Sequence, residues 1–349
     1  GHDGRIVALD HVSARFPDGQ CVAVVGPSGC GKSTLLRVVA GLDTDYSGDV
    51  LYDGQDMRDV HVKDRYIGMV FQNYALFPHL SVAENVAYGL RLRKLPAPEI
   101  AKKTGRILEM VRMTGLGNRM PAQLSGGQQQ RAALARALVI QPGVLLLDEP
   151  LSNLDAGLRL QLREEIKQIQ RESRVTTLYV THDQEEALSL ADRLAVMREG
   201  RIIQTGTPRQ LYRHPADRFT AEFLGPINWI EGRVASLTAE YLGTLQTPLG
   251  RWRVEFPSKP KMNQPFLCGI RPENVRMTAD GDNTFPATLV DVHFQGDHEL
   301  VHVEVAGGRT WKIKAPPMAV EPAPAATVTL SIASRDLIVL PAEEAPPLP

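Results

Sequence analysis

The 349-residue chain contains little cysteine and no long apolar run. Its three cysteines, Cys21, Cys30 and Cys268, are too few and too scattered for a disulfide framework or a zinc site. No stretch approaches roughly 18 consecutive apolar residues, so we expect no segment that spans a bilayer. The residues after Gly1 lack the apolar core of a signal peptide. These shortages predict a soluble protein of a reducing compartment, the cytosol.

The chain also has almost no net charge. Its 39 Lys and Arg residues are balanced by 40 Asp and Glu residues, which leaves a formal charge of −1. Such a balance gives no electrostatic footprint for general nucleic-acid binding. The length allows about two domains, each able to bury a core of its own.

Short apolar runs alternate with helical patterns over residues 1–226. Three of the runs, Val22–Val25, Val144–Leu147 and Thr177–Val180, suit strands that are buried on both faces, as in a parallel sheet. A helix that begins after an Asp N-cap is expected over residues 155–173. Strands that alternate with helices predict an α/β domain.

Residues 82–120 interrupt this alternation with two consecutive helical patterns. The patterns are Val82–Leu95 and Glu99–Met113, and we expect Pro96 and Pro98 to separate them. We interpret this region as a helical insert in the α/β domain, spanning about residues 75–135.

The segment 227–349 is rich in proline and has no long helical pattern. Its apolar residues recur with a period of two instead. They are Val290, Val292 and Phe294, then Val301, Val303 and Val305, then Val328, Leu330 and Ile332. This period predicts half-buried antiparallel strands. Short strands with frequent turns predict a second, all-β domain that is a small barrel or a sandwich.

A glycine-rich turn follows the first apolar run and precedes a helical pattern. It consists of Gly26, Pro27, Ser28, Gly29, Cys30, Gly31, Lys32, Ser33 and Thr34. In such a loop several backbone N–H groups face one anion, and the helix N-terminus adds partial positive charge. Lys32 would reach the β- and γ-phosphates of a nucleotide, and the Ser33 hydroxyl would bind Mg²⁺. The pattern therefore predicts a P-loop.

Two carboxylates end the second apolar run. Asp148 could hold Mg²⁺ at the end of a buried strand. Glu149, the next residue, could accept a proton from an attacking water. An acidic pair at a strand end is more often a helix cap or a turn, so the catalytic interpretation depends on the P-loop upstream.

The segment Leu124–Gln128 allows two interpretations. Ser125 and Gln128 resemble a capping box, which would make the segment only the start of a well-capped helix. Gly126 and Gly127, however, lower helix stability in the first turn. Their advantage would be exposed backbone N–H groups that face an anion.

At this point the chain resembles the ATPases of ABC transporters. Leu124–Gln128 is similar to their signature, Gln72 to the residue of their Q-loop, and His182 to their switch histidine. Asp155, in Ser152–Asp155, is similar to their D-loop residue. The resemblance covers residues 5–226 and implies a P-loop ATPase fold.

The resemblance also implies a mechanism. Two copies would face each other head to tail, with ATP between the P-loop of one copy and Ser125, Gly127 and Gln128 of the other. Glu149 would polarise water, and His182 would contact the γ-phosphate. Gln72 would sense Mg²⁺ and water and would relay the state to a partner on the helical insert.

The segment Cys268–Val275 and the strands after it resemble the C-terminal OB-fold domain of importer ATPases. These are the maltose, glycerol-phosphate, polyamine and iron types. The resemblance implies a peripheral subunit at the cytoplasmic face of the membrane. It would power solute import through membrane permease subunits, with a solute-binding protein as an indirect partner and polyamine, iron or sugar as substrate class. The domain could serve regulation or only dimerisation.

One alternative is a soluble ABC ATPase that acts on ribosomes or nucleic acid. Members of that class pair two ATPase units or insert a coiled coil, and neither pattern is present. No basic groove with interleaved aromatic residues is visible either, so no nucleic-acid partner is expected.

Two further expectations concern nucleotide contacts. The family has a β-strand before the position of residue 5, ending in an aromatic residue that stacks on adenine. We therefore name no adenine-stacking residue, and for the sequence as given we expect weakened ATP affinity and an exposed sheet edge. Cys30, beside Lys32 at a helix N-terminus, is expected to be a reactive thiolate that ATP protects from alkylation.

Overall fold

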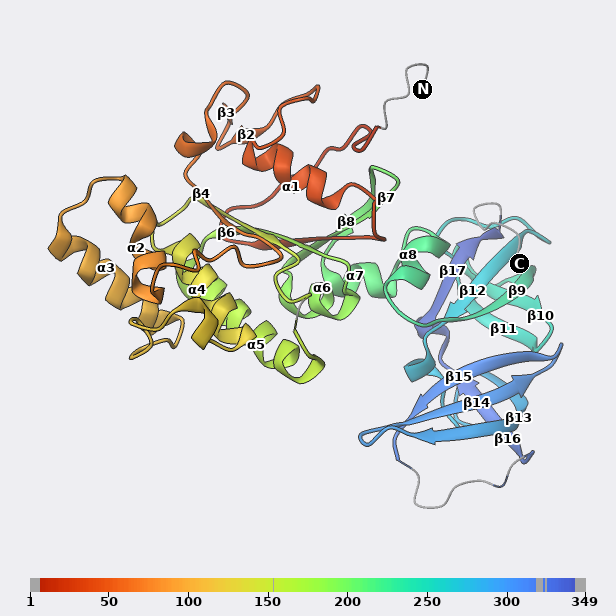
Figure 1. The fold of residues 1–349 in the computed structure, drawn as a ribbon. Coiled ribbons are helices and arrows are strands. Elements are labelled where there is room, and N and C mark those ends of the chain that lie inside the picture. Colours follow the sequence, from red (N-terminus) through yellow and green to blue (C-terminus); the bar gives the residue numbers. More distant parts are fainter. Residues whose placement is uncertain (1–6, 153, 318–322, 324, 343–349) are drawn as a thin grey trace. The chain divides into compact units, whose positions relative to one another are not determined.

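The computed structural model describes residues 7–152, 154–317, 323 and 325–342. The chain divides into two compact units, Gly1–Pro208 and Arg209–Pro349 (Figure 1). The second domain was expected to begin at residue 227. In the structure the second unit begins at Arg209, so it also includes two short helices before that residue. Each unit is described by itself below.

The first unit alternates strands and helices. Its strands are β1 (Cys21–Val25), β2 (Leu51–Tyr52), β3 (Gln55–Asp56), β4 (Ile67–Val70), β5 (Val144–Asp148), β6 (Thr176–Thr181), β7 (Arg193–Arg198) and β8 (Arg201–Gly206). Its helices are α1 (Lys32–Ala40), α2 (Val82–Leu92), α3 (Ala97–Met110), α4 (Gly126–Leu138), α5 (Ala156–Ser173) and α6 (Gln184–Leu190), with 3₁₀ turns η1 (Val62–Asp64) and η2 (Pro121–Gln123).

Six of these strands form one sheet in the order β4-β5-β6-β1-β7-β8. All neighbours are parallel except β8, which is antiparallel to β7. Helix α1 lies on one face of the sheet, and α5 and α6 lie on the other (Figure 1). Leu146 of β5 packs in the cluster with α1, whereas Leu145 and Leu147 line the side of Ile166 on α5. The predicted parallel sheet, buried on both faces, is confirmed.

Local signals in the sequence mark the end of one helix and the start of another. Helix α1 ends at Gly41, whose φ of 75° is the left-handed conformation of a helix C-cap. Helix α5 begins after Asp155, whose carboxylate accepts a hydrogen bond of 2.9 Å from the Leu158 N–H group.

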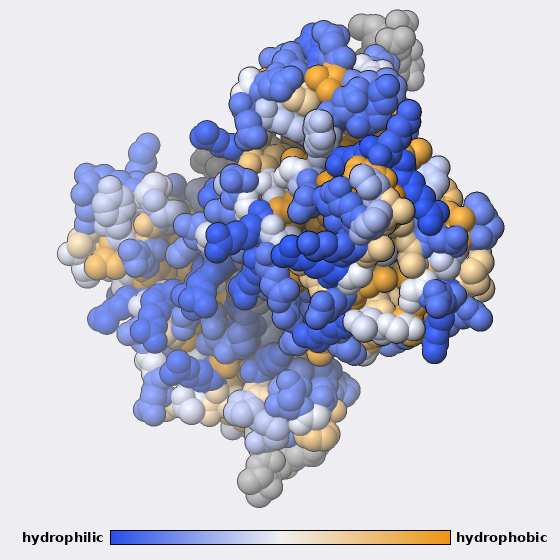
Figure 2. Space-filling view, turned by 90° about the vertical axis from the view of Figure 1, so that its left-hand side faces the viewer, coloured by the Kyte–Doolittle hydropathy of each residue, from blue (hydrophilic) through white to orange (hydrophobic). Residues whose placement is uncertain are grey.

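Helices α2 and α3 form the expected helical insert, but its break differs from the prediction. Only Pro96 marks the break, because it is the N-cap of α3. Pro98 lies inside the first turn of α3, where the missing N–H group would have no helical partner in any case. The side of the molecule that carries these helices is mostly hydrophilic (Figure 2). Within the described residues, no helix has the length and apolar character that crossing a membrane requires.

The second unit consists mainly of strands. They are β9 (Asn228–Leu237), β10 (Leu242–Thr247), β11 (Gly250–Glu255), β12 (Pro265–Ile270), β13 (Asn283–Phe294), β14 (Glu299–Val305), β15 (Arg309–Ala315), β16 (Thr327–Ile332) and β17 (Leu337–Pro341). Two helices precede them, α7 (Pro208–Arg213) and α8 (Arg218–Phe223), and two 3₁₀ turns, η3 (Pro272–Asn274) and η4 (Ser334–Asp336), connect them.

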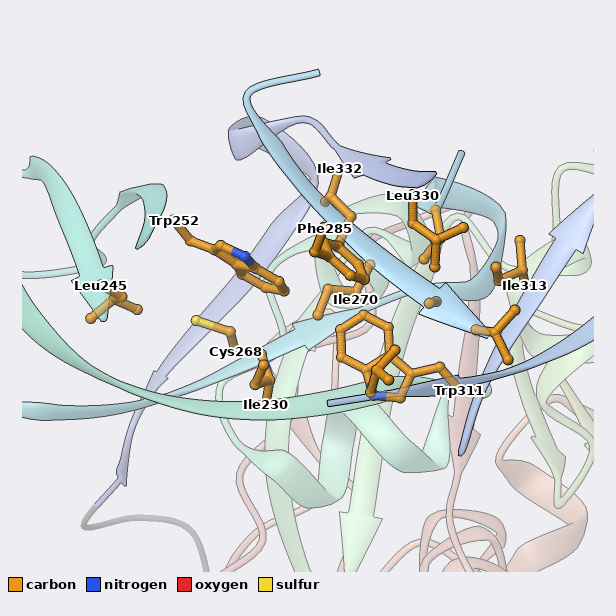
Figure 3. Packing of buried hydrophobic residues seen from close by; sticks show 14 of the residues in the cluster. Ile230, Leu245, Trp252, Cys268, Ile270, Phe285, Trp311, Ile313, Leu330 and Ile332 are labelled. Carbon is orange, nitrogen blue, oxygen red and sulfur yellow. The ribbon is translucent and has the colours of Figure 1, made fainter. Parts of the chain in front are cut away.

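The strands form two sheets around one apolar core. The sheets have the orders β11-β10-β9-β12-β17 and β15-β14-β13-β16. Trp252, Phe285 and Trp311 meet at the centre of the core, with ring centroids 5.5 to 6.2 Å apart (Figure 3). The expected all-β domain is therefore confirmed.

The predicted buried face of one strand is partly wrong. Val290 and Phe294 were expected on the buried face of a half-buried strand, but they are 50% and 67% exposed. The register of β13 against β14 shifts between Leu289 and Asp291, which marks a β-bulge. Before the bulge, Phe285 and Leu289 are buried. The alternation of apolar residues does not show where the extra residue falls.

Candidate functional site

The predicted P-loop connects β1 to α1 at the carboxyl end of β1. Gly29 and Gly31 have φ values of 79° and 105°, which L side chains rarely adopt. A Cβ atom on Gly26 would lie 2.1 Å from the carbonyl oxygen of Met197 on β7. The loop therefore depends on glycine for both its curl and its close packing.

Lys32 lies across this loop and is only 5% exposed. Its Nζ donates hydrogen bonds of 2.8 Å to the Gly26 carbonyl and 2.9 Å to the Pro27 carbonyl. In the part of the chain that the structure describes, no carboxylate forms an ion pair with Lys32. A phosphate over the loop would therefore meet a cation whose charge is still uncompensated.

Ser33 and Asp148 come together although they lie far apart in the sequence. The Ser33 hydroxyl donates to Asp148 Oδ1 at 3.2 Å. Burial raises the pKa of Asp148, and the neighbouring charge of Glu149 raises it further, whereas the Ser33 hydrogen bond lowers it. A hydroxyl and a carboxylate are oxygen ligands of the kind that Mg²⁺ prefers. No group of three His, Cys, Asp or Glu side chains in the described residues could hold a metal.

Glu149 is the centre of a second group at the same edge of the sheet. His182 Nδ1 lies 3.1 Å from Glu149 Oε2, and Gln72 Nε2 lies 3.5 Å from the same oxygen. Gln72 follows β4, Glu149 follows β5 and His182 follows β6, so neighbouring parallel strands present all three side chains. Glu149 has a φ of 45°, which is uncommon outside glycine and often marks a functional site.

The signature segment lies apart from these groups within one chain. The Ser125 N–H group donates to Gln128 Oε1 at 3.0 Å, and the Gln128 N–H group donates to Ser125 Oγ at 3.4 Å. The predicted capping box is thus confirmed. Among the described residues, no hydrogen bond joins Ser125 or Gln128 to the P-loop.

Close helix packing gives a second reason for the two signature glycines. A Cβ atom on Gly126 would lie 2.8 Å from the Leu154 side chain. One on Gly127 would lie 3.2 Å from the side chains of Leu158 and Leu162. Because these leucines are on or just before α5, the glycines let α4 approach α5. The exposed N–H groups of these glycines can be predicted from the sequence, whereas this close packing cannot.

Glu186 lies in the first turn of α6, but its side chain contacts the preceding strand. Asp183 caps this helix, because its Oδ1 accepts from the Glu186 N–H group at 3.0 Å. The Glu186 carboxylate is buried and accepts the hydroxyl groups of Tyr179 at 2.9 Å and Thr181 at 2.8 Å. Thr181 precedes His182, so Glu186 supports the turn that presents the histidine. No local sequence pattern signals this contact.

A pH series should reveal this buried carboxyl group. Burial raises the pKa of Glu186 above its usual range, so the folded state binds the proton more tightly than the unfolded state. Stability from the proton is present at low pH and is lost as the pH rises through the folded pKa. We therefore expect Glu186→Gln to gain stability relative to the original chain as pH rises, in urea unfolding at pH 5 to 8. A constant difference would contradict this account.

Cys30 is less accessible than its predicted reactivity requires. Its side chain is 5% exposed and packs with Val24, Leu35 and Met197, and its Sγ lies 3.9 Å from Lys32 Nζ. A reagent would have little access to this thiol, so the structure gives no support to the alkylation that was expected.

Comparison with known proteins agrees with this geometry. Residues 9–152 match the family model of the ABC transporter, and residues 268–340 match the TOBE domain. The chain is 43% identical over 87% of its length to the Fe(3+) ions import ATP-binding protein FbpC of Photorhabdus laumondii, and the match covers 85% of that protein. It is 45% identical over 84% of its length to the spermidine/putrescine import ATP-binding protein PotA of Rubrobacter xylanophilus, with 78% of that protein covered.

A solved structure shows the same fold for the first unit. It is the dimeric, post-hydrolysis state of the ATP-binding cassette MJ0796 bound to ADP and Pi. The match has a TM-score of 0.52 and 33% sequence identity, and it covers 58% of this chain and 91% of that one. Fold and site thus define a P-loop ATPase of the ATP-binding cassette class. The chain belongs to the ABC transporter family, among its import ATP-binding subunits.

Proposed function

We propose that this chain is the subunit that hydrolyses ATP to power solute import, and we assign its site residues as follows. The P-loop residues 26–34 bind the phosphates of ATP, with Lys32 at the β- and γ-phosphates. Ser33, Asp148 and Gln72 hold Mg²⁺, which when bound neutralises phosphate charge. Glu149 accepts the proton of the attacking water, and His182 contacts the γ-phosphate.

One observation carries the proposal. The Glu149 carboxylate lies between Gln72 and His182 at the same sheet edge as the P-loop and the Ser33–Asp148 pair. A general base, a phosphate cradle and a pair of oxygen ligands at one edge are the parts that phosphoryl transfer to water requires. A structural acidic pair would need neither the histidine nor the uncompensated Lys32.

Two copies of the chain would complete the site. Among the described residues, no hydrogen bond joins Ser125 or Gln128 to the P-loop of their own chain, as a head-to-tail dimer requires. In such a dimer they would face the nucleotide of the other copy, giving two equivalent sites. The dimeric state of the related ATP-binding cassette supports this arrangement.

Membrane permease subunits would be the partners on the helical insert, with a solute-binding protein as an indirect partner and the cytoplasmic face of the membrane as location. Relatives named for iron and for spermidine or putrescine are almost equally similar to this chain. We therefore propose a substrate of the polyamine, iron or sugar class, selected by the permease and not by this subunit. A role on ribosomes or nucleic acid has no supporting observation here.

Ser125→Asp tests the proposed dimer. Aspartate is as good an N-cap as serine, so the variant keeps the start of α4 but places a negative charge where the partner's triphosphate would lie. With Mg²⁺ and a non-hydrolysable ATP analogue, we expect the original chain to dimerise and the variant to lose at least about tenfold in dimer affinity, measured by analytical ultracentrifugation.

Ser81→Asp is the matched control, because Ser81 forms the same capping box with Glu84 at the start of α2. It should dimerise like the original chain. Equal effects of the two substitutions, or unchanged dimerisation of Ser125→Asp, would contradict the head-to-tail site.

A further inference from the structure

Arg136 connects the helix that begins at the signature segment to the loop that carries Gln72. It lies near the end of α4, and its Nη1 donates to the Ala75 carbonyl at 2.7 Å. Its Nη2 donates to the Tyr74 carbonyl at 3.0 Å, and its Cζ lies 5.4 Å from the centre of the Phe77 ring. One guanidinium group therefore fixes three neighbouring residues of the loop.

The loop needs such a support, because its backbone is strained. Tyr74 and Ala75 are consecutive non-glycine residues with φ values of 61° and 47°, in the left-handed region. The Tyr74 N–H group donates to the Phe71 carbonyl at 2.9 Å, which closes a turn around Gln72. Arg136 donates to the carbonyls of both left-handed residues.

The other end of α4 is the signature segment. The helix runs from Gly126 to Leu138 after the Ser125 N-cap. Ser125 and Arg136 are about 16 Å apart along a continuous helix, so a displacement of one end moves the other. In the proposed dimer, Ser125 faces the partner's nucleotide, whereas the Gln72 loop belongs to the chain's own Glu149.

We propose that Arg136 is a positioning residue. It places Gln72 beside Glu149 only when α4, the helix that begins at the signature segment of the same subunit, is in the right position. Each active site thereby responds to whether the same subunit has engaged the nucleotide of the other. This inference rests on the proposed function, because it requires both the dimer and the role of Glu149.

If the inference holds, a substitution of Arg136 affects ATP turnover only at the Glu149 of the same subunit. Arg136→Ala should lower kcat about tenfold, with KM and analogue-driven dimerisation unchanged within about twofold, because only the loop of Gln72 is released. Arg136→Lys should be intermediate, since an ammonium group cannot serve two carbonyls in the fork geometry of arginine.

Arg93→Ala is the matched control. Arg93 also donates to a backbone carbonyl, that of Ile140 at 2.9 Å, and also lies 5.4 Å from an aromatic ring, that of Tyr66. It has no contact with the Gln72 loop in the described part of the chain. Its kcat should stay within about twofold of the original.

Dimers with a single working site separate the inference from damage to the signature helix. Two affinity tags allow Arg136→Ala to be paired with a Glu149→Gln partner, whose own site is blocked. The kcat of this dimer should be about tenfold lower than that of a dimer of the original chain with the same Glu149→Gln partner. In a second dimer, Arg136→Ala is placed in the subunit that carries Glu149→Gln. This subunit contributes only its signature segment to the working site, so the rate of ATP turnover should be unchanged.

A loss in this second placement, an equal loss in Arg93→Ala, or a loss of dimerisation in both Arg136 variants would overturn the inference. Failure of the proposed function looks different: the original chain would then show no ATP turnover, or Glu149→Gln would retain it.

Discussion

Glu149→Gln is expected to lower ATP turnover at least about 100-fold while leaving ATP binding intact. Its Oε2 is the atom that both His182 and Gln72 approach, at 3.1 and 3.5 Å. An amide has nearly the same shape as a carboxylate but cannot take a proton from water. Because the change keeps the side-chain length and the backbone conformation, the P-loop and the Ser33–Asp148 pair remain in place. Phosphate release and binding of a fluorescent ATP analogue measure the two effects.

Glu185→Gln is the control for this variant. Glu185 is in the first turn of α6, close to His182 in sequence, but its side chain is 82% exposed. In the described residues, its side chain pairs only with Arg163, at 3.2 Å, and such an exposed pair contributes little. We expect its turnover to stay within about twofold of the original. Retained turnover in Glu149→Gln would falsify the assignment of the general base.

The parts of the site that could be predicted are those whose signals are local. The P-loop, the carboxylates at the end of β5 and the Asp155 cap each depend on a few consecutive residues next to an apolar strand or a helix start. Parallel strands also bring their carboxyl ends to one edge, so the approach of Gln72, Glu149 and His182 follows from the sheet topology once the strands are recognised.

The parts that could not be predicted depend on contacts between distant residues. Arg136 meets residues 74 and 75, and Glu186 uses a tyrosine and a threonine of the preceding strand. A single arginine or glutamate in a helical pattern is predicted to lie on the solvent-exposed face of the helix, and no neighbouring residue indicates otherwise. The bulge in β13 could not be predicted for another reason. Apolar and polar residues alternate on both sides of it, and this alternation alone does not show where the register shifts.

Arg271 shows the same limit and affects the second unit most strongly. In the sequence it is one polar residue of the segment Cys268–Val275, yet in the structure it is only 1% exposed. Its Nη1 donates to the carbonyls of Ala221 and Gly225 at 2.9 and 2.8 Å, and its Nη2 to that of Tyr212 at 3.3 Å. Its Cζ also lies 4.1 Å from the centre of the Tyr212 ring. These partners lie in α7, α8 and the segment after them, so one buried cation holds this part of the chain to the strands.

Arg271→Leu should therefore lower the free energy of unfolding of the second unit by at least about 3 kcal/mol, because several buried carbonyls lose their donor together. The three tryptophans, Trp229, Trp252 and Trp311, all lie in this unit, so tryptophan fluorescence during urea unfolding reports on it alone. Arg251→Leu is the control. Arg251 is exposed, and within the described residues its side chain forms one hydrogen bond, of 3.3 Å to Gln246. Its loss should therefore cost less than about 0.5 kcal/mol.

The same contacts predict where the second unit can be cut. A fragment of residues 209–349 keeps the carbonyl partners of Arg271, whereas one of residues 227–349 leaves its buried guanidinium group without them. We expect the longer fragment to unfold cooperatively at nearly the urea midpoint of the intact unit, and the shorter one to show no cooperative transition. Equal midpoints for the two fragments, or a loss below about 1 kcal/mol in Arg271→Leu, would show that the arginine does not hold the helices to the strands.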